Sequence, residues 1–581
     1  MVKPAVIARG DSNKVPSSIA KAIDGELIIA KSTSLIPALQ AAFRSGRPIV
    51  TNVAAPIVIR ALAPYLGSKY TDPPVIATSY DGRFIVPLLG LSHGANKLAR
   101  QIEMALGGTT VSFGGTASYF QAGNALDESP DGYICRNPGH YKDFAVSFLD
   151  GETLSVDGNA PWLFTLPQTR DAALKVTVTD RDISGSTKHL VFVSKTLSVG
   201  LGCERGTSRE ELTELVDRTL HDNGLAQEAV ACFASIDLKE DEPAISSIID
   251  SERLRFFTAQ ELQTQLPKIR NPSSIVLAEV GTPSVAEAAA LAAAGPDAQL
   301  IVEKTKSLHA TCAVARSPLP ILEYPGRPRG ELTVVGIGPG NKNMRSPEAD
   351  VALWWATDFV GYSLYLDLVS DARHEQTLHP FPLGAEEDRV RHAIALAKQG
   401  KRVALICSGD AGIYAMAALV YEMIDLEPCR IDVQVIPGIS AFQAAAAKAG
   451  AMIGHDFCCI SLSDLLTPWE VIEKRVKAAA EGNFVVSFYN PRSAKRRDQL
   501  ERAFAILAEH RPKDTPVIIA SKLGRPEEKM KIVPFADFNP DDVDMLTLVM
   551  VGSSQSKSFT RGDGKTYAYT PRGYAKKRNP A

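Results

Sequence analysis

A nearly bare turn at residues 336–340, GIGPG, carries the strongest sign of ligand chemistry in this sequence. Glycine has no Cβ, so a ligand can approach the backbone closely at such a turn. The apolar run 333–335 before the turn predicts a buried strand. After the turn, Ser346 and Pro347 predict the N-cap and the first residue of a helix. Strand, glycine turn and helix in this order are typical of the nucleotide-type pockets of α/β proteins.

The turn departs from the dinucleotide fingerprint Gly-x-Gly-x-x-Gly. Its third glycine comes one residue early, and Pro339 removes a backbone donor that a pyrophosphate would need. Asp358 lies near the distance expected of a ribose ligand, but it precedes the next apolar run instead of ending it. The turn therefore fits a small adenosyl ligand without a pyrophosphate better than NAD. A purely structural turn and an NAD-type oxidoreductase site are the two alternatives.

Five further apolar runs in the C-terminal half also end in glycine, small or polar residues. In open α/β sheets ligands bind at the carboxyl ends of strands, so six such ends predict one pocket lined mostly by backbone groups. The strands and the residues that follow them are 333–335 with 336–340, 403–407 with 408–412, 433–436 with 437–441, 484–488 with 489–491, 517–520 with 521–524, and 546–551 with 552–553.

The composition is that of an ordinary globular protein. The chain has 581 residues, of which 45% are hydrophobic and 22% are charged, enough for roughly three to five domains. A formal net charge of −3 gives no electrostatic case for nucleic acid or for an anionic membrane. There is no apolar run of about 18 residues and no signal core, and the eight cysteines form no C-x-x-C pair or zinc pattern. We expect a reduced, cytoplasmic protein without a metal site.

The rhythm of apolar runs predicts a multidomain α/β protein. Residues 1–105 alternate strands and helices, 106–192 read as a small, mostly β insertion, and 193–316 return to the α/β rhythm. Residues 317–330 are rich in proline and predict a linker. Residues 331–581 are a second run of α/β units.

Two helices in the third of these regions have clear start signals. Ser208 and Glu211 fit a capping box. Thr282 is predicted as an N-cap, with Pro283 as the first helical residue and Gly295 beyond the end.

The C-terminal motifs together resemble the tetrapyrrole methyltransferases of cobalamin biosynthesis. Within that family they are most similar to the enzymes acting on ring carbon 17 of precorrin-3B or, in the anaerobic route, of cobalt-factor III. The resemblance covers essentially all of 331–581 and implies two α/β lobes, a tetrapyrrole substrate and a homodimer. The motifs are GIGPG (336–340), SGDAGIYAMA (408–417), PGISA (437–441), GHDFCCISLSDLLTPW (454–469), SFYNPRS (487–493) and TPRGY (570–574).

The resemblance also implies S-adenosylmethionine as methyl donor, bound in the cleft between the lobes. Carried over motif by motif, the residues along the donor would be Gly338, Pro339, Gly409, Asp410, Ala411, Ser440, Ala441, Asn490 and Leu523.

The family's chemistry couples methylation to ring contraction, so a group must take the proton of a substrate hydroxyl and another must assist the migrating bond. Our candidates are His455, Asp456, Ser461, Ser463, Asp464 and Tyr489. The alternative for residues 454–456 is a loop that holds the lobes together. Basic residues that could bind the carboxylates of the substrate include Arg345, Arg492, Lys495 and Arg572.

The N-terminal region resembles a second family, cobalamin-biosynthesis protein G, the cobalt-precorrin 5A hydrolase. That resemblance implies opening of a lactone with release of a two-carbon aldehyde, with His93, Glu204, Asp237 and Lys306 as candidates. The alternative is a non-catalytic tetrapyrrole-binding module; either would act with other cobalamin-pathway enzymes. The motifs are IRALAPYL (59–66), TDPPVIATSYDGRFIVPLLGLSHGANKLAR (71–100), GLGCERGTSREEL (200–212), IDLKEDEP (236–243), GTPSVAEAAAL (281–291) and KTKSLHATCAVAR (304–316).

Overall fold

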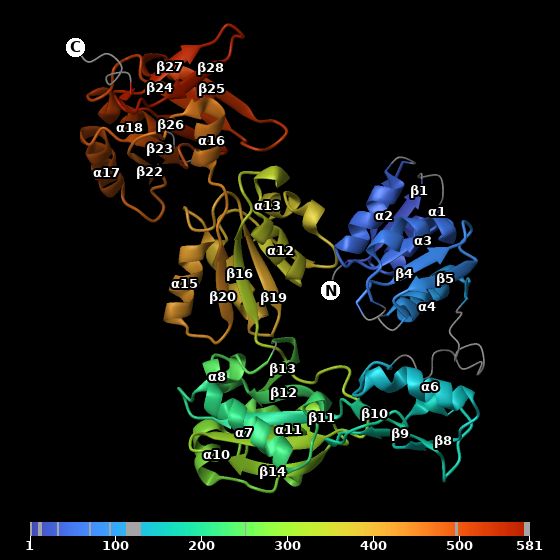
Figure 1. Ribbon diagram of the computed structural model, residues 1–581. Helices are drawn as coiled ribbons and strands as arrows, with labels where there is room; N and C mark the ends of the chain where they lie inside the picture. The colour runs from blue at the N-terminus through green and yellow to red at the C-terminus, as the bar shows by residue number, and fades with distance from the viewer. Residues whose placement is uncertain are drawn as a thin grey trace. The chain divides into compact units, whose positions relative to one another are not determined.

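The computed structural model describes most of the chain: residues 3–9, 14–31, 34–68, 71–91, 94–111, 129–164, 166–249, 251–493 and 498–574. It divides into two compact units, Met1–Ala234 with Gln260–Pro325 and Ser235–Ala259 with Gly326–Ala581. Both are built from α/β bodies (Figure 1). No helix in these described ranges is long and apolar enough to cross a membrane.

The N-terminal body is a six-stranded sheet in the order β2-β1-β3-β4-β5-β6. β1 to β4 are parallel, whereas β5 runs antiparallel to β4. Apolar residues of both faces pack against the helices. The strands are β1 Ala5–Arg9, β2 Glu26–Ala30, β3 Ile49–Thr51, β4 Val75–Thr78, β5 Phe84–Leu89 and β6 Thr109–Thr110, and the helices are α1 Lys14–Ala22, α2 Leu35–Arg44, α3 Ala55–Leu62 and α4 Ala95–Leu106.

Two further sheets follow, one small and one α/β. The small sheet has the order β7-β10-β9-β8, and the α/β sheet has the order β13-β12-β11-β15-β14. The bounds are β7 Tyr133–Cys135, α6 Tyr141–Leu149, β8 Leu154–Asp157, β9 Leu174–Thr179, β10 His189–Ser194, β11 Leu197–Cys203, α7 Arg209–Asp222, β12 Val230–Ile236, β13 Leu254–Phe257, α10 Ser274–Val280, α11 Ala286–Ala294, β14 Gln299–Lys306 and β15 Ala310–Arg316.

The predicted helix starts in this region need two corrections. The Ser208 hydroxyl does accept the N–H of Glu211, but the Glu211 carboxylate bonds Ser307 and His309 instead of closing a capping box. The prediction of Thr282 as N-cap was wrong, because α11 begins at Ala286. Thr282 is fully buried, and its hydroxyl bonds a backbone carbonyl two residues ahead.

The first C-terminal lobe is a wholly parallel sheet in the order β18-β17-β19-β16-β20. Its three central strands, β17, β19 and β16, are mostly buried because both faces are covered by helices. α14 and α15 pack on one face over one shared apolar cluster, and α12 packs on the other face over a second cluster. Figure 1 shows α15 and α12 on opposite sides of the sheet. The bounds are β16 Glu331–Gly336, α12 Pro347–Trp355, β17 Asp358–Tyr362, α13 Ser363–Asp367, β18 Thr377–Phe381, α14 Glu386–Ala397, β19 Arg402–Cys407, α15 Met416–Leu426 and β20 Asp432–Ile436.

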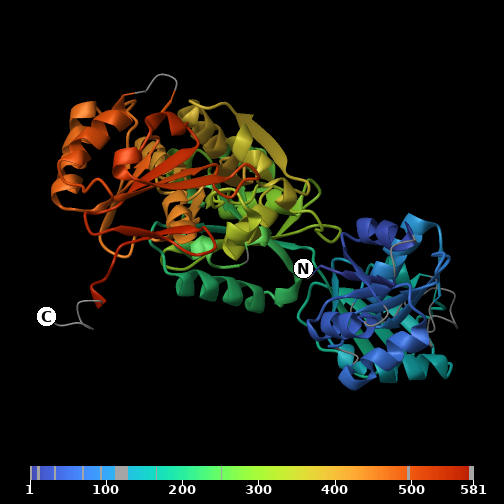
Figure 2. The ribbon, with the colours of Figure 1, turned by 90° about the horizontal axis from the view of Figure 1, so that it is seen from above.

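The second lobe joins a mixed sheet, β22-β23-β26-β24-β25, to a small sheet, β21-β28-β27. Figure 2 shows its orange helices beside the strands. The bounds are α16 Ala441–Ala449, β21 Gly450–Ala451, β22 Phe457–Ser461, α17 Trp469–Glu481, β23 Val485–Tyr489, α18 Gln499–Ala508, β24 Pro516–Ser521, β25 Lys529–Pro534, β26 Thr547–Val551, β27 Lys557–Thr560 and β28 Thr566–Tyr569.

One of the six predicted strand ends does not belong with the others. β26 runs antiparallel to both of its neighbours, β23 and β24. Gly552 and Ser553 after it therefore lie at the opposite edge of the sheet from the residues that follow β23 and β24. The prediction of six converging ends was wrong at this strand, because an apolar run in a sequence does not reveal its direction in the sheet.

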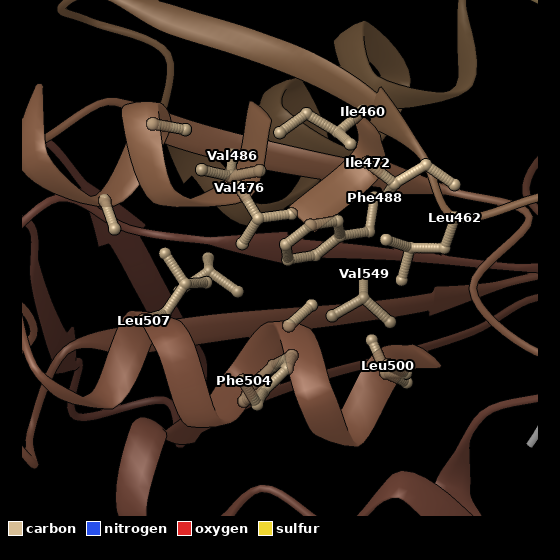
Figure 3. Packing of buried hydrophobic residues seen from close by; sticks show 14 of the residues in the cluster. Ile460, Leu462, Ile472, Val476, Val486, Phe488, Leu500, Phe504, Leu507 and Val549 are labelled. Atoms are coloured by element: carbon tan, nitrogen blue, oxygen red, sulfur yellow. The ribbon is translucent and has the colours of Figure 1, made fainter. Parts of the chain in front are cut away.

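Phe488 occupies the centre of the core of the second lobe. Its side chain is fully buried, and Figure 3 shows the ring directed into the space between Val476 and the helix α18, which carries Phe504. Replacing a fully buried aromatic ring with alanine removes its apolar contacts and leaves a cavity.

We therefore expect Phe488→Ala to destabilise this lobe by about 3–5 kcal/mol. Hydrogen exchange of the amides in β23 and β26 would report the change locally in the full-length protein. Phe559→Ala is the matched control, because that ring is 50% exposed. Equal protection of β23 in both variants would contradict the prediction.

Candidate functional site

The candidate site lies at the carboxyl edge of the parallel sheet of the first lobe, where β16, β19 and β20 end side by side. The turns after β16 and β19 are bonded to each other. The Gly338 N–H donates to the Gly409 carbonyl at 3.1 Å, and the Gly409 N–H donates back at 2.8 Å. Both glycines have positive φ, 75° and 71°, which other residues adopt only with strain.

Two more glycines let the third turn approach. A Cβ on Gly438 would lie 2.0 Å from the Gly409 oxygen and 2.7 Å from the Gly336 carbonyl carbon. A Cβ on Gly336 would lie 2.6 Å from the Gly438 nitrogen. Three backbone turns therefore meet with no room for a side chain. The result is a cradle of main-chain groups beside the buried Pro339.

The Asp410 carboxylate ties two of these turns together. One oxygen accepts the N–H groups of Gly412 at 2.8 Å and Ile413 at 3.2 Å, and the other accepts the N–H of Gly438 at 3.1 Å. Asp410 thus orders its own loop and fixes that loop to the turn after β20. Ala411, next in the chain, is fully buried.

Ser440 and Ala441 begin α16, the helix that leads into the second lobe. Ser440 is buried and forms a capping box with Gln443: its hydroxyl accepts the backbone N–H of Gln443, and the Gln443 side chain accepts the Ser440 N–H at 3.0 Å. Ala441 is partly buried. The first turn of α16 therefore starts at the same sheet edge as the glycine turns.

The second lobe contacts the opening glycine turn through the loop after β24. A Cβ on Gly524 would lie 2.9 Å from the Asn341 nitrogen and 3.1 Å from the Gly340 nitrogen. Leu523 is buried, and its carbonyl lies 3.2 Å from the position of a Cβ on Gly340. The sequence-predicted residues Gly338, Pro339 and Leu523 are thus brought into one region from two lobes.

Tyr489 lies at the end of β23 and faces the first lobe. Its hydroxyl accepts the N–H of Phe442 at 3.3 Å, and its ring lies 5.3 Å from that of Tyr414. Burial raises the pKa of Tyr489 well above its ordinary value. Tyr489 is therefore a protonated phenol at neutral pH, suited to donate a hydrogen bond and unsuited to act as a base.

Tyr414 connects the lobes and was not predicted from the sequence. Its hydroxyl donates to the Cys459 carbonyl in β22 at 2.9 Å. Its backbone has a φ of 51°, unusual for a residue with a side chain. The only hint in the sequence is its place in the glycine-rich segment 408–417, which predicts a loop but not this backbone angle.

Ser461, Asn490 and Asp464 gather at the carboxyl ends of β22 and β23. The Asn490 amide donates to the Ser461 hydroxyl at 3.2 Å, and Asn490 has a φ of 48°. The Ser461 hydroxyl also accepts the N–H of Ser463 at 3.3 Å. Asp464 is exposed and accepts a hydrogen bond from Gln499 at 2.8 Å.

His455 and Asp456 lie at the other end of β22. The strand Phe457–Ser461 separates them from Ser461, and a strand of this length spans about 13 Å. The Asp456 carbonyl accepts the N–H of Val485 at the start of β23, and both His455 and Asp456 are exposed. The structure therefore does not bring these two candidates together with Ser461, Asp464 and Tyr489.

Two predicted substrate-binding arginines are already paired. Arg345 is 7% exposed and bonds Asp371 through two nitrogens, at 3.1 Å and 2.8 Å, and Asp350 through a third. Arg492 bonds Asp541 and the Pro540 carbonyl. The prediction that Arg345 meets substrate was wrong, because its guanidinium is buried in an internal ion pair.

The remaining predicted residues are scattered. Arg572 is exposed, and Lys495 and His93 lie outside the described residues. Glu204 follows β11 and Lys306 ends β14, which run in the same direction, so both lie at one edge of their sheet. Asp237 bonds Arg327 at 3.3 Å.

Within the described chain, no group of three or more His, Cys, Asp or Glu side chains is arranged to hold a metal.

Comparison with known families matches the chain in three places. Residues 331–539 match the tetrapyrrole (corrin/porphyrin) methylases. Residues 37–116 match the family described as cobalamin synthesis G N-terminal, and 197–315 match cobalamin synthesis G C-terminus. All three families are those that the sequence motifs resemble.

Individual proteins similar to this chain bear names that correspond to the methylase match. A probable cobalt-factor III C(17)-methyltransferase of Salmonella typhimurium is 46% identical over 243 residues, 42% of this chain and 99% of the relative. A precorrin-3B C(17)-methyltransferase of Sinorhizobium sp is 41% identical over 249 residues, 42% of this chain and 98% of the relative. The crystal structure of the methyltransferase CobJ is 40% identical, covering 42% of this chain and 100% of that chain with a TM-score of 0.39.

A relative matched over nearly its whole length at this identity defines the family. The chain belongs to the tetrapyrrole (corrin/porphyrin) methylases, and residues 37–116 and 197–315, before the methylase region, match the two cobalamin synthesis G families.

The glycine cradle makes a sharp prediction for Gly438. Alanine there would push the three turns apart, because its Cβ would meet the Gly409 oxygen at 2.0 Å. We expect Gly438→Ala to weaken S-adenosylhomocysteine binding on the order of 10-fold or more, since positional errors near 1 Å are costly at such sites. Isothermal titration would measure it. Gly562→Ala, with no atom within 4 Å of its new Cβ, is the control; equal affinity of the two variants would contradict the prediction.

The buried ion pair predicts a pH dependence. The Arg345 guanidinium lowers the pKa of Asp371 from 3.8 to about 2. Because the folded-state pKa is the lower one, this contribution to stability is present above about pH 4 and is lost as the pH falls through about 2. Asp371→Asn should remove that part of the acid transition and lower the melting temperature at pH 7. The exposed Asp425→Asn is the control; an unchanged acid transition in Asp371→Asn would refute the assignment.

Proposed function

We propose that residues 331–581 transfer a methyl group from S-adenosylmethionine to ring carbon 17 of precorrin-3B, with ring contraction to precorrin-4. The observation that carries the proposal is the similarity over 99% and 98% of the length of two C(17)-methyltransferases. The arrangement of the candidate site supports it, because a cradle of main-chain groups suits a reaction that needs alignment more than a nucleophile.

The donor would be held by the glycine cradle and by the start of α16. When bound, S-adenosylmethionine supplies an electrophilic methyl group on a sulfonium. The crowding at Gly336 and Gly438 supports this fit, because it leaves main-chain groups and no side chain at the sheet edge. The proposed donor residues are Gly338, Pro339, Gly409, Asp410, Ala411, Ser440, Ala441, Asn490 and Leu523.

In this proposal the side chains of the second lobe handle the proton chemistry. Tyr489, protonated at neutral pH, donates a hydrogen bond to a substrate oxygen while its own oxygen stays bonded to Phe442. Asp464 is the exposed carboxylate at the same edge and is the candidate base. His455 and Asp456 remain candidates for a separate role, since they lie at the other end of β22.

Cobalt-factor III is the second candidate substrate. The Salmonella relative bears that name, and its identity, 46%, exceeds the 41% of the precorrin-3B relative. Mass spectrometry of products made from each tetrapyrrole with labelled methyl donor would decide between them. Methylation of neither would refute the proposed function.

We propose that residues 1–105 and 193–316 form a cobalamin synthesis G-like module around the insertion 106–192, joined by the linker 317–330 to the methyltransferase. It acts either as a cobalt-precorrin 5A hydrolase or as a non-catalytic tetrapyrrole-binding module, in a cytoplasmic homodimer working beside other cobalamin-pathway enzymes. Truncation in the linker separates the two roles. Release of a two-carbon aldehyde from the lactone by residues 1–320 supports the hydrolase, and no release supports the binding module.

The role of Tyr489 can be tested directly. We expect Tyr489→Phe to lower kcat about 100-fold, the scale of general acid–base contributions, while S-adenosylhomocysteine affinity stays within twofold. Tyr421→Phe, an exposed tyrosine on α15, is the control. An unchanged kcat would remove Tyr489 from the mechanism without affecting the proposed methyl transfer.

A further inference from the structure

Arg389, on α14, is a buried cation whose charge the described residues barely balance. The residue is 3% exposed. Nη2 donates to the Pro382 carbonyl at 3.0 Å, Nη1 lies 3.8 Å from the Met416 sulfur, and Nε has no partner. In the described chain, Glu386 is its only carboxylate neighbour, at 4.0 Å with 41% of the side chain exposed. Burying a charge without close compensation is costly, so an arginine in this state is suited to bind an anion.

Arg525 supplies a second cation from the other lobe. It follows β24, and its side chain covers the opening glycine turn: a Cβ on Gly340 would lie 2.9 Å from the Arg525 Cγ and 3.5 Å from its Nε. The residue is partly exposed. Its guanidinium makes no ion pair with any carboxylate in the described ranges.

Tyr365, on α13, lies within the electrostatic field of both arginines. Burial raises its pKa, although the charges of Arg525 and Arg389 oppose that shift. Its ring packs edge-on against Tyr362 at 5.2 Å. The phenol stays protonated and is a hydrogen-bond donor. The helix α13 packs on β19, Arg389 contacts Met416 after β19, and Arg525 covers the turn after the neighbouring strand β16. The two guanidinium groups and the Tyr365 hydroxyl are all donors.

We propose that Arg389, Arg525 and Tyr365 receive one carboxylate of the tetrapyrrole substrate. Guanidinium groups bind carboxylates through paired, charge-assisted hydrogen bonds, which matches the donors present. The partly exposed Arg525 contacts the carboxylate from the solvent side, and the buried Arg389 adds a second positive charge from the protein interior. The inference rests on the proposed function, which implies a substrate with many carboxylates.

The carboxylate of the methyl donor is the other possible source of the anion. Arg525 covers the turn after β16, and β16 lies next to β20, which the proposed donor residues Ser440 and Ala441 follow. The test therefore measures the affinity for the tetrapyrrole and for the donor analogue separately.

The test compares Arg525→Met and Arg389→Met with a matched control on the same helix. Arg391 on α14 is exposed and pairs with Glu387 and Glu427, so Arg391→Met removes a charge outside the site. We expect both site variants to raise the KM for the tetrapyrrole about 10- to 100-fold, the loss typical of a hydrogen-bonded charge pair. Their S-adenosylhomocysteine affinity should stay within twofold, and Arg391→Met should match the wild type in both measurements.

Two results would overturn the inference. An unchanged tetrapyrrole KM in Arg525→Met, checked for folding by circular dichroism, would do so even if Arg389→Met failed to fold. Weakened S-adenosylhomocysteine binding with an unchanged tetrapyrrole KM would assign the carboxylate to the donor instead. Tetrapyrrole binding by absorbance titration keeps this test separate from the proposed function, because binding is readable even if the wild type methylates neither candidate substrate.

Discussion

The close approach of three backbone turns at Gly336, Gly409 and Gly438 is the constraint on which the C-terminal body depends. A single Cβ at Gly438 would lie 2.0 Å from the Gly409 oxygen, so the turns can meet only where side chains are absent. The same contact brings the ends of β16, β19 and β20 to one place and starts α16 toward the second lobe. The surface of the candidate site and the connection between the two lobes therefore depend on the same close packing of the glycine turns.

Charged side chains in this body mostly maintain the scaffold. Asp410 accepts three backbone N–H groups and orders two turns, and Arg345 is held between Asp371 and Asp350. These groups are therefore not free for a substrate. Arg389 and Arg525 differ, because neither has a carboxylate closer than 4.0 Å in the described chain. The charge of the site therefore comes from the side chains that form no close ion pair within the protein.

Both halves of the chain contain α/β sheets, but the directions of their strands differ. In the first C-terminal lobe all five strands are parallel, so every carboxyl end lies at one edge. In the second lobe β26 is reversed between β23 and β24, and its end faces away from the site. The N-terminal sheet likewise reverses at β5. Strand direction, not strand number, decides how many turns can line a site.

The sequence by itself determined the elements and the family. Apolar runs predicted six strands of the C-terminal body, β16, β19, β20, β23, β24 and β26, and glycine turns predicted a backbone-lined site, because burial and backbone freedom are local properties of residue types. Tertiary structure alone decided which residues meet. It separated His455 from Tyr489 by the length of β22, reversed β26, buried Arg345 in an ion pair and left Arg389 without a close carboxylate. These outcomes depend on strand direction and long-range pairing, which no local pattern encodes.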